Sequence, residues 1–174
     1  MKLAVISDIH DNIWNLQKAL TMPQLQATEA MLCCGDLCSP FIIHLLGKAY
    51  TKPIHMVLGN NDGDVAAIIG NSMKYSNVHI HGEYFKSTLG GRTLAMNHYP
   101  NKARAIANNG GFDIVCYGHN HTMVNDEMVD NTLLINPGAI MGYHGGDLRD
   151  ITATWLLLDT AQLKAEVYRI QTAY

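Results

Sequence analysis

The first 70 residues repeat one pattern three times: a short apolar run, a polar turn and a segment with helical spacing. The apolar runs lie at residues 3–6, 30–34 and 54–58, and the helical segments at residues 13–20, 41–49 and from residue 65 onward. Strands that alternate with helices pair in parallel, because each helix carries the chain back over the sheet. The pattern therefore predicts an α/β fold.

The remaining chain is richer in strands. Three pairs of segments separated by turn residues predict hairpins: residues 83–88 with 92–97, 123–128 with 132–135, and 151–158 with 163–170. A helix is expected at residues 101–109 and a buried strand at residues 113–117. This order predicts two sheets packed face to face with helices outside. No linker, low-complexity segment or fixed repeat interrupts residues 1–174, so we expect a single domain.

The composition argues against several classes of protein. The 174 residues are 48% hydrophobic and 16% charged, which suits one domain with a substantial core. The formal net charge is -3 and no run of Lys and Arg occurs, so the sequence lacks the basic footprint of a nucleic-acid-binding protein. No apolar stretch approaches the roughly 20 residues of a membrane helix. A soluble protein that does not enter membranes is expected.

The cysteines indicate a cellular compartment. The four cysteines are Cys33, Cys34, Cys38 and Cys116, and they form no CxxC pair. No signal peptide is recognisable at Met1. Buried, reduced thiols in a cytoplasmic protein are therefore expected.

Polar side chains with metal-ligating chemistry follow the apolar runs. Asp8 and His10 come directly after the first run and are two residues apart, so on an extended backbone they point to the same side. The full set of such residues is Asp8, His10, Asp36, Asn60, His98, His119 and His121. Oxygen and imidazole donors suit manganese, iron, zinc or nickel. Asp and Asn also favour turns and helix caps, so each turn taken alone has a second explanation.

The ordered set of motifs resembles a known family. The motifs are Asp8-Ile9-His10, Gly35-Asp36, Gly59-Asn60-Asn61-Asp62, His98, Gly118-His119-Asn120-His121 and Asn136-Pro137-Gly138. In this order they resemble the calcineurin-like metallophosphoesterases, and most of all the small single-domain phosphodiesterases of bacteria and archaea. The resemblance implies a four-layer α/β/β/α sandwich of two mixed sheets flanked by helices.

The resemblance also implies two divalent metal ions, with manganese expected and iron, zinc or nickel left open. The first ion would be held by Asp8, His10, Asp36 and His121, and the second by Asp36, Asn60, His98 and His119. The implied reaction is hydrolysis of a small phosphodiester by a hydroxide that bridges the two ions, without a covalent intermediate. The predicted catalytic residues are Asp36, Asn61 and Asp62, and the predicted substrate contacts are Asn12, Asn61 and His144.

Two positions depart from the family pattern. Asn61 stands where the family often has His, and an amide cannot deliver a proton to the leaving group at neutral pH. This difference predicts a preference for diesters and activated esters over alkyl monoesters, unless His144 or another nearby group acts as the acid. Ala139 stands where the family often has Ser, which puts a substrate contact there in doubt.

Other interpretations stay open. A non-catalytic protein-binding scaffold of the same fold, as in a eukaryotic retromer subunit, is the main alternative, and a phosphomonoesterase or a nuclease is a further one. Asn12 also suits the N-cap of the helix expected at residues 13–20. His44 and His55 suit core or surface positions, and His79 with His81 suits the exposed face of a strand. A homo-oligomeric state is left open.

Overall fold

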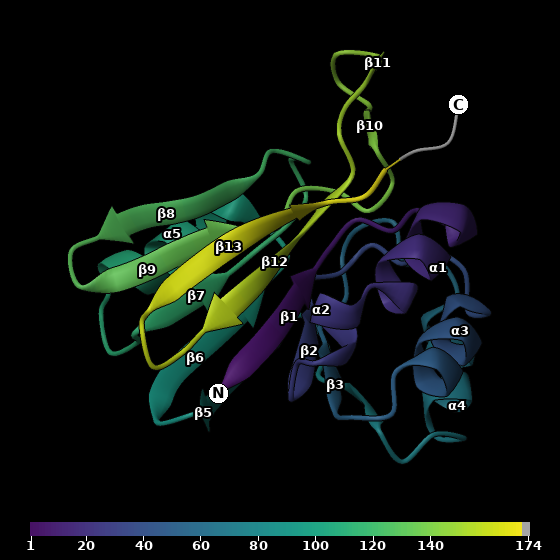
Figure 1. Cartoon of the computed structure of the whole chain (residues 1–174), viewed down its shortest axis with the longest axis horizontal. Helices are drawn as coiled ribbons and strands as arrows, with labels where there is room; N and C mark the ends of the chain where they lie inside the picture. The colour runs from purple at the N-terminus through teal and green to yellow at the C-terminus, as the bar shows by residue number, and fades with distance from the viewer. Residues whose placement is uncertain (172–174) are drawn as a thin grey trace.

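Two large β-sheets with helices outside them form the body of the molecule, and the computed structural model describes residues 1–171 (Figure 1). The first sheet, in the order β13-β12-β1-β2-β3-β4, contains β1 (Lys2–Ile6), β2 (Ala30–Cys33), β3 (Ile54–Met56), β4 (Val78–Ile80), β12 (Thr154–Asp159) and β13 (Lys164–Arg169). The second sheet, in the order β5-β6-β7-β9-β8, contains β5 (Tyr84–Leu89), β6 (Arg92–Asn97), β7 (Ile114–Cys116), β8 (Val124–Val129) and β9 (Thr132–Asn136).

Both sheets are mixed. Strands β1 to β4 pair in parallel, as the alternation with helices predicts, whereas β12 runs antiparallel to both β1 and β13. In the second sheet β6, β7 and β9 are parallel to one another, and the edge strands β5 and β8 are antiparallel. The parallel strands matter for function, because their carboxyl ends gather the loops that follow them at one edge of each sheet.

The helices lie on the outer faces of the two sheets. They are α1 (Ile13–Thr21), α2 (Pro23–Gln26), α3 (Ile42–Ala49), α4 (Val65–Ser72) and α5 (Pro100–Asn108). Asn12 caps α1, because its side chain accepts a hydrogen bond from the backbone N–H of Asn15 at 3.1 Å. Within residues 1–171, every helix is too short or too polar to cross a lipid bilayer.

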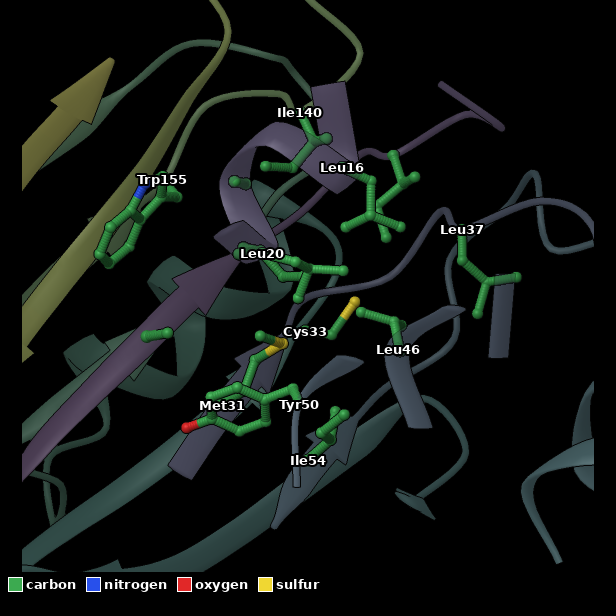
Figure 2. Close-up of a cluster of buried hydrophobic side chains, with 14 of the residues drawn as sticks. Leu16, Leu20, Met31, Cys33, Leu37, Leu46, Tyr50, Ile54, Ile140 and Trp155 are labelled. Carbon is green, nitrogen blue, oxygen red and sulfur yellow. The ribbon is translucent and has the colours of Figure 1, made fainter. Parts of the chain in front are cut away.

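The layers follow from the two-residue alternation of the strands. In β1, Leu3 and Val5 point into the core between the two sheets, whereas Ala4 and Ile6 point toward α1 and α3. Figure 2 shows the helix-side core, where Leu16 and Leu20 of α1 lie near β1 and β2 and Leu46 belongs to α3. A third, smaller core joins α5 to the outer face of the second sheet. The predicted four-layer α/β/β/α sandwich is confirmed.

One element differs from the sequence expectation. The chain between β9 and β12 forms a small hairpin of β10 (Tyr143–His144) and β11 (Arg149–Asp150), which projects from one end of the sandwich in Figure 1. Residues 143–150 are rich in glycine and polar residues, and each strand is two residues long, so no alternating pattern could predict them. Strand β12 accordingly begins at Thr154, three residues later than expected.

The expectation of buried, reduced thiols holds for three of the four cysteines. Cys33, Cys34 and Cys116 are buried and free, whereas Cys38 is free but only half-buried. Burial raises the pKa of the Cys33 thiol to about 12, with smaller contributions from nearby carboxylates. These buried thiols are therefore protonated packing groups at neutral pH.

Candidate metal centre

The seven candidate ligands follow strands of both sheets and meet at one site. Asp8 and His10 follow β1, Asp36 follows β2 and Asn60 follows β3, all in the first sheet. From the second sheet, His98 follows β6, and His119 with His121 follows β7. The carboxyl ends of parallel strands in the two facing sheets therefore supply all seven side chains.

One group of donors consists of Asp8, His10 and His121, whose ligand atoms lie within 4.8 Å of one another. The Nε2 atoms of His10 and His121 are 3.2 Å apart. The Oδ1 atom of Asp8 lies 3.7 Å from His10 Nε2 and 3.4 Å from His121 Nε2. Three donor atoms from two sheets therefore surround one small volume.

A second group consists of Asp36, His98 and His119. The Oδ2 atom of Asp36 is 3.3 Å from His98 Nε2. Asn60 belongs to the same group, because its Oδ1 atom lies 3.2 Å from His98 Nε2 and 2.9 Å from His119 Nδ1.

Asp36 lies between the two groups. Its Oδ2 atom is 3.5 Å from His10 Nε2 in the first group and 3.3 Å from His98 Nε2 in the second. The carboxylate therefore adjoins both clusters, and its expected role as a ligand shared by two ions stays a prediction.

Backbone carbonyls orient two of the imidazoles. The Nδ1 atom of His98 is 2.7 Å from the carbonyl oxygen of Cys34, and that of His121 is 2.6 Å from the carbonyl oxygen of Tyr143. A carbonyl oxygen can only accept, so Nδ1 carries the hydrogen in each ring and Nε2 faces the centre. Such second partners fix both the tautomer and the ring orientation of metal-binding histidines.

The two carboxylates of the centre are ionised at neutral pH. Burial raises the pKa of Asp8, but the contacts with His10 and His121, the charge of His98 and the Ser7 hydroxyl together lower it below its usual value. Burial also raises the pKa of Asp36, and the contact with His98, its charge and the hydrogen bonds from Asn61 together lower it by more. Two ionised carboxylates in so small a volume favour cations.

Five of the seven candidate ligands have a strained backbone. The φ angles are 53° at Asp8, 41° at His10, 57° at Asp36, 75° at His119 and 56° at His121. A non-glycine residue in this region costs on the order of 1–3 kcal/mol, and such residues concentrate at functional sites. Positive φ angles thus occur at most of the positions that supply the candidate donors.

Three glycines make room for the ligand loops. A Cβ atom at Gly59 would lie 2.2 Å from Asp36 Oδ1, and one at Gly118 would lie 2.7 Å from Asp8 Oδ2. A Cβ atom at Gly35, whose φ is +101°, would lie 2.7 Å from His98 Nδ1. The close approach of backbone to ligand explains why glycine precedes three of the motifs.

Asn61 and His144 line an open cleft of about 390 Å³ beside the centre, together with His10, His119 and His121. Asn61 donates from its backbone N to Asp36 Oδ1 and from its side-chain Nδ2 to Asp36 Oδ2, both at 2.8 Å. The ring of His144 lies edge-on to that of His121, with centroids 6.2 Å apart. Both residues are thus near the centre.

Asp62 and Asn12 have other contacts. Asp62 is buried and accepts hydrogen bonds from the backbone N–H groups of Gly59 at 2.7 Å, Cys38 at 2.9 Å and Asp36 at 3.1 Å. It therefore holds the loops that carry Asp36 and Asn60, and a direct catalytic part stays a prediction. Asn12 caps α1 and donates to the carbonyl oxygen of Met141 at 2.8 Å, and its substrate contact likewise stays a prediction.

Sequence reasoning missed three supporting groups. The carbonyls of Cys34 and Tyr143 have no sequence signal, because every residue carries a carbonyl. Asp11 accepts hydrogen bonds from the backbone N and the hydroxyl of Ser39, at 2.9 and 2.6 Å, and so ties the first ligand loop to the second. Its place directly after the Asp8-Ile9-His10 motif was the one available signal.

Comparisons with known proteins agree with this geometry. Residues 1–162 match the family model of the calcineurin-like phosphoesterase superfamily domain. Phosphodiesterase MJ0936 of Methanocaldococcus jannaschii is 29% identical over 148 residues, which cover 84% of this chain and 88% of that protein.

Solved structures share the fold. That of an archaeal phosphodiesterase has a TM-score of 0.85 and 27% identity, covering 97% of this chain and 99% of the other. Vps29 of Chaetomium thermophilum has a TM-score of 0.71 at 17% identity, covering 99% of this chain and 87% of the other, a likeness of fold alone. Since the family model spans nearly the whole sequence, the chain belongs to the calcineurin-like phosphoesterase superfamily.

Proposed function

We propose that the protein is a phosphodiesterase that uses two divalent metal ions. The observation that carries the proposal is the convergence of seven donors in two groups that adjoin Asp36. The likeness to a protein named a phosphodiesterase, over 84% of the chain, supports the same conclusion.

The donor set fits two cations. The two Nε2 atoms of His10 and His121 lie 3.2 Å apart, while Nδ1 of His121 carries its hydrogen toward Tyr143. Two nitrogens about 3 Å apart suit a single ion, because zinc–nitrogen bonds of about 2.0–2.1 Å span that distance. Asp8, His10, Asp36 and His121 would hold the first ion, and Asp36, Asn60, His98 and His119 the second.

Bound ions would supply Lewis-acid chemistry and make a water molecule acidic enough to act as a nucleophile near neutral pH. The protein itself orients the substrate in the cleft that Asn61 and His144 line. The amide of Asn61 can donate a hydrogen bond to a phosphoryl oxygen but holds no proton to give. Esters with good leaving groups, which need no acid, are therefore the preferred substrates, and His144 is the nearby group that can carry a proton.

The test is hydrolysis of bis-p-nitrophenyl phosphate and p-nitrophenyl phosphate after addition of manganese. We expect faster hydrolysis of the diester, and a loss of about 10²-fold or more in Asp36→Asn and His119→Ala. Asp126→Asn and His79→Ala make the same chemical changes at exposed positions and serve as controls. A faster reaction of the monoester would contradict the diester preference alone. Absence of both metal binding and hydrolysis would favour a scaffold without catalysis.

A further inference from the structure

A second cleft, of about 340 Å³, adjoins the cleft of the metal centre. The two clefts share His121 and His144 in their walls. Arg149 and Arg169 also line the second cleft. A molecule that occupies the metal cleft can therefore extend past the two histidines toward two guanidinium groups.

Two distant segments of the chain supply these arginines. Arg149 lies in β11 of the projecting hairpin, and Arg169 is the last residue of β13. Arg169 pairs with Thr154, the first residue of β12, so it lies at the end of the sheet from which the hairpin projects (Figure 1). The backbone N–H of Ile151 donates to the carbonyl oxygen of Gly142 at 3.1 Å and closes the base of the hairpin.

Two arginines line the second cleft, although the chain has a formal net charge of -3. Among the described residues that line it, none is Asp or Glu. Arg149 donates from Nε to Asp147 Oδ2 at 3.1 Å, which leaves its other donors available. Within residues 1–171, Arg169 forms no ion pair. Guanidinium groups with available donors bind phosphate and carboxylate groups through paired hydrogen bonds.

We propose that the second cleft is a specificity subsite for a second anionic group on one ester arm of the substrate. The inference rests on the proposed function, because the scissile phosphodiester occupies the metal centre while Arg149 and Arg169 bind the further phosphate or carboxylate. The substrate class is then a small phosphodiester with an additional negative charge. Two arginines in a chain of net negative charge suit a small molecule better than a nucleic acid, which needs an extended basic surface.

A pair of chromogenic diesters that differ by one phosphate tests the subsite. The first is the p-nitrophenyl ester of thymidine 5′-phosphate, and the second carries an additional 3′-phosphate. We expect kcat/KM to be about tenfold higher for the phosphorylated ester, the gain of one charge-assisted hydrogen bond. Arg169→Gln and Arg149→Gln should each remove most of this preference and leave hydrolysis of the unphosphorylated ester unchanged. Arg104→Gln, an exposed arginine that pairs with Glu127 on β8, is the control.

Each outcome separates the subsite from the proposed function. Hydrolysis of both esters at equal rates, or a preference that survives both arginine substitutions, would overturn the subsite and leave the phosphodiesterase intact. Absence of all hydrolysis would refute the proposed function. The subsite would then be tested by the binding of nucleotides with one or two phosphates. Calorimetry with chelator-treated protein should show that thymidine 3′,5′-bisphosphate binds about tenfold tighter than thymidine 5′-phosphate. Equal affinities would refute the subsite, as would a difference that persists in Arg169→Gln.

Discussion

In the proposed reaction, Asn61 is the residue that we expect to select the leaving group. Its side chain lines the metal cleft and donates to Asp36 Oδ2 at 2.8 Å. The amide thus has the right place to contact a phosphoester but lacks an acidic proton. Substitutions at position 61 can therefore distinguish a side chain that only donates a hydrogen bond from one that also transfers a proton.

Asn61→His should raise kcat/KM for alkyl monoesters by at least about tenfold, because general-acid help is typically worth 10²–10⁴ in rate. The gain for bis-p-nitrophenyl phosphate should be smaller, since its leaving group departs without a proton. Asn61→Gln keeps an amide and should show no gain on either ester. Steady-state kinetics decide the matter, and an equal or reversed effect on the two esters would refute this role of position 61.

His55 makes a different contribution, to stability. It lies in β3, stacks on Phe85 with ring centroids 4.7 Å apart, and has its Nδ1 atom 3.0 Å from His81 Nε2. Burial, followed by the charges of His81 and His79, lowers the pKa of His55 from 6.5 to about 4. The unfolded chain therefore binds a proton in a pH range where the folded protein does not, and stability falls as the pH falls from about 6.5 toward 4.

We expect His55→Gln to show a weaker loss of stability between pH 7 and pH 4.5 than the unsubstituted protein. Urea unfolding in the presence of a chelator measures it at both pH values and keeps metal binding out of the comparison. His44→Gln, in α3 and outside this cluster of histidines, is the control. The same pH dependence in His55→Gln and the unsubstituted protein would contradict the assignment.

At the scale of elements, the contact between the ends of β7 and β1 requires a glycine. Gly118 follows β7, and a Cβ atom there would lie 2.0 Å from Ser7 Oγ and 2.7 Å from Asp8 Oδ2. The end of β7 in the second sheet thereby contacts the end of β1 in the first. A methyl group between them would have to displace the loop of one strand or the other.

Gly118→Ala should destabilise the protein by about 1–3 kcal/mol, the usual effect of overpacking, and reduce diester hydrolysis at least about tenfold because Asp8 moves. Gly63→Ala places its methyl group where nothing lies within 4 Å and should change neither property. Urea unfolding and the diester assay give the two readouts. Full activity in Gly118→Ala would show that the strand ends are less tightly coupled than their geometry indicates.

At the scale of the whole molecule, the candidate ligands join two sheets. Asp8, Asp36 and Asn60 follow strands of the first sheet, whereas His98 and His119 follow strands of the second. A cation bound by both sets would therefore stabilise the packing of the sheets as well as supply chemistry. Binding to the folded state alone adds about 2.7 kcal/mol when the free ligand is at 100 times its Kd.

Manganese should raise the thermal unfolding midpoint of the protein, and a chelator should reverse the shift. Asp36→Asn weakens both proposed sites at once and should lose most of the shift, whereas Asp126→Asn should keep it. Calorimetry across a range of manganese concentrations provides the measurement. A midpoint independent of manganese would argue against metal binding by the folded protein, whatever the activity assay shows.

The sequence by itself determined the order of most elements and the identity of the candidate donors. The alternation of apolar runs, polar turns and helical spacing placed β1 to β3 with the helices between them, because hydrophobic periodicity depends on neighbours along the chain. The hairpins β5–β6 and β12–β13 were predictable from paired apolar segments around turn residues. The seven donors were recognisable because each follows an apolar run and belongs to an ordered motif.

Only the tertiary structure decided how these residues are used. Asp62 binds backbone N–H groups and orders the ligand loops, a role that depends on the fold around it. The carbonyls of Cys34 and Tyr143 orient the imidazoles, and Arg149 with Arg169 forms the second cleft, although these residues lie far apart in the chain. Periodicity depends on neighbours along the chain, and the motifs do not identify these contacts between distant segments. Such contacts exist only once burial of the shared core has brought the two sheets together.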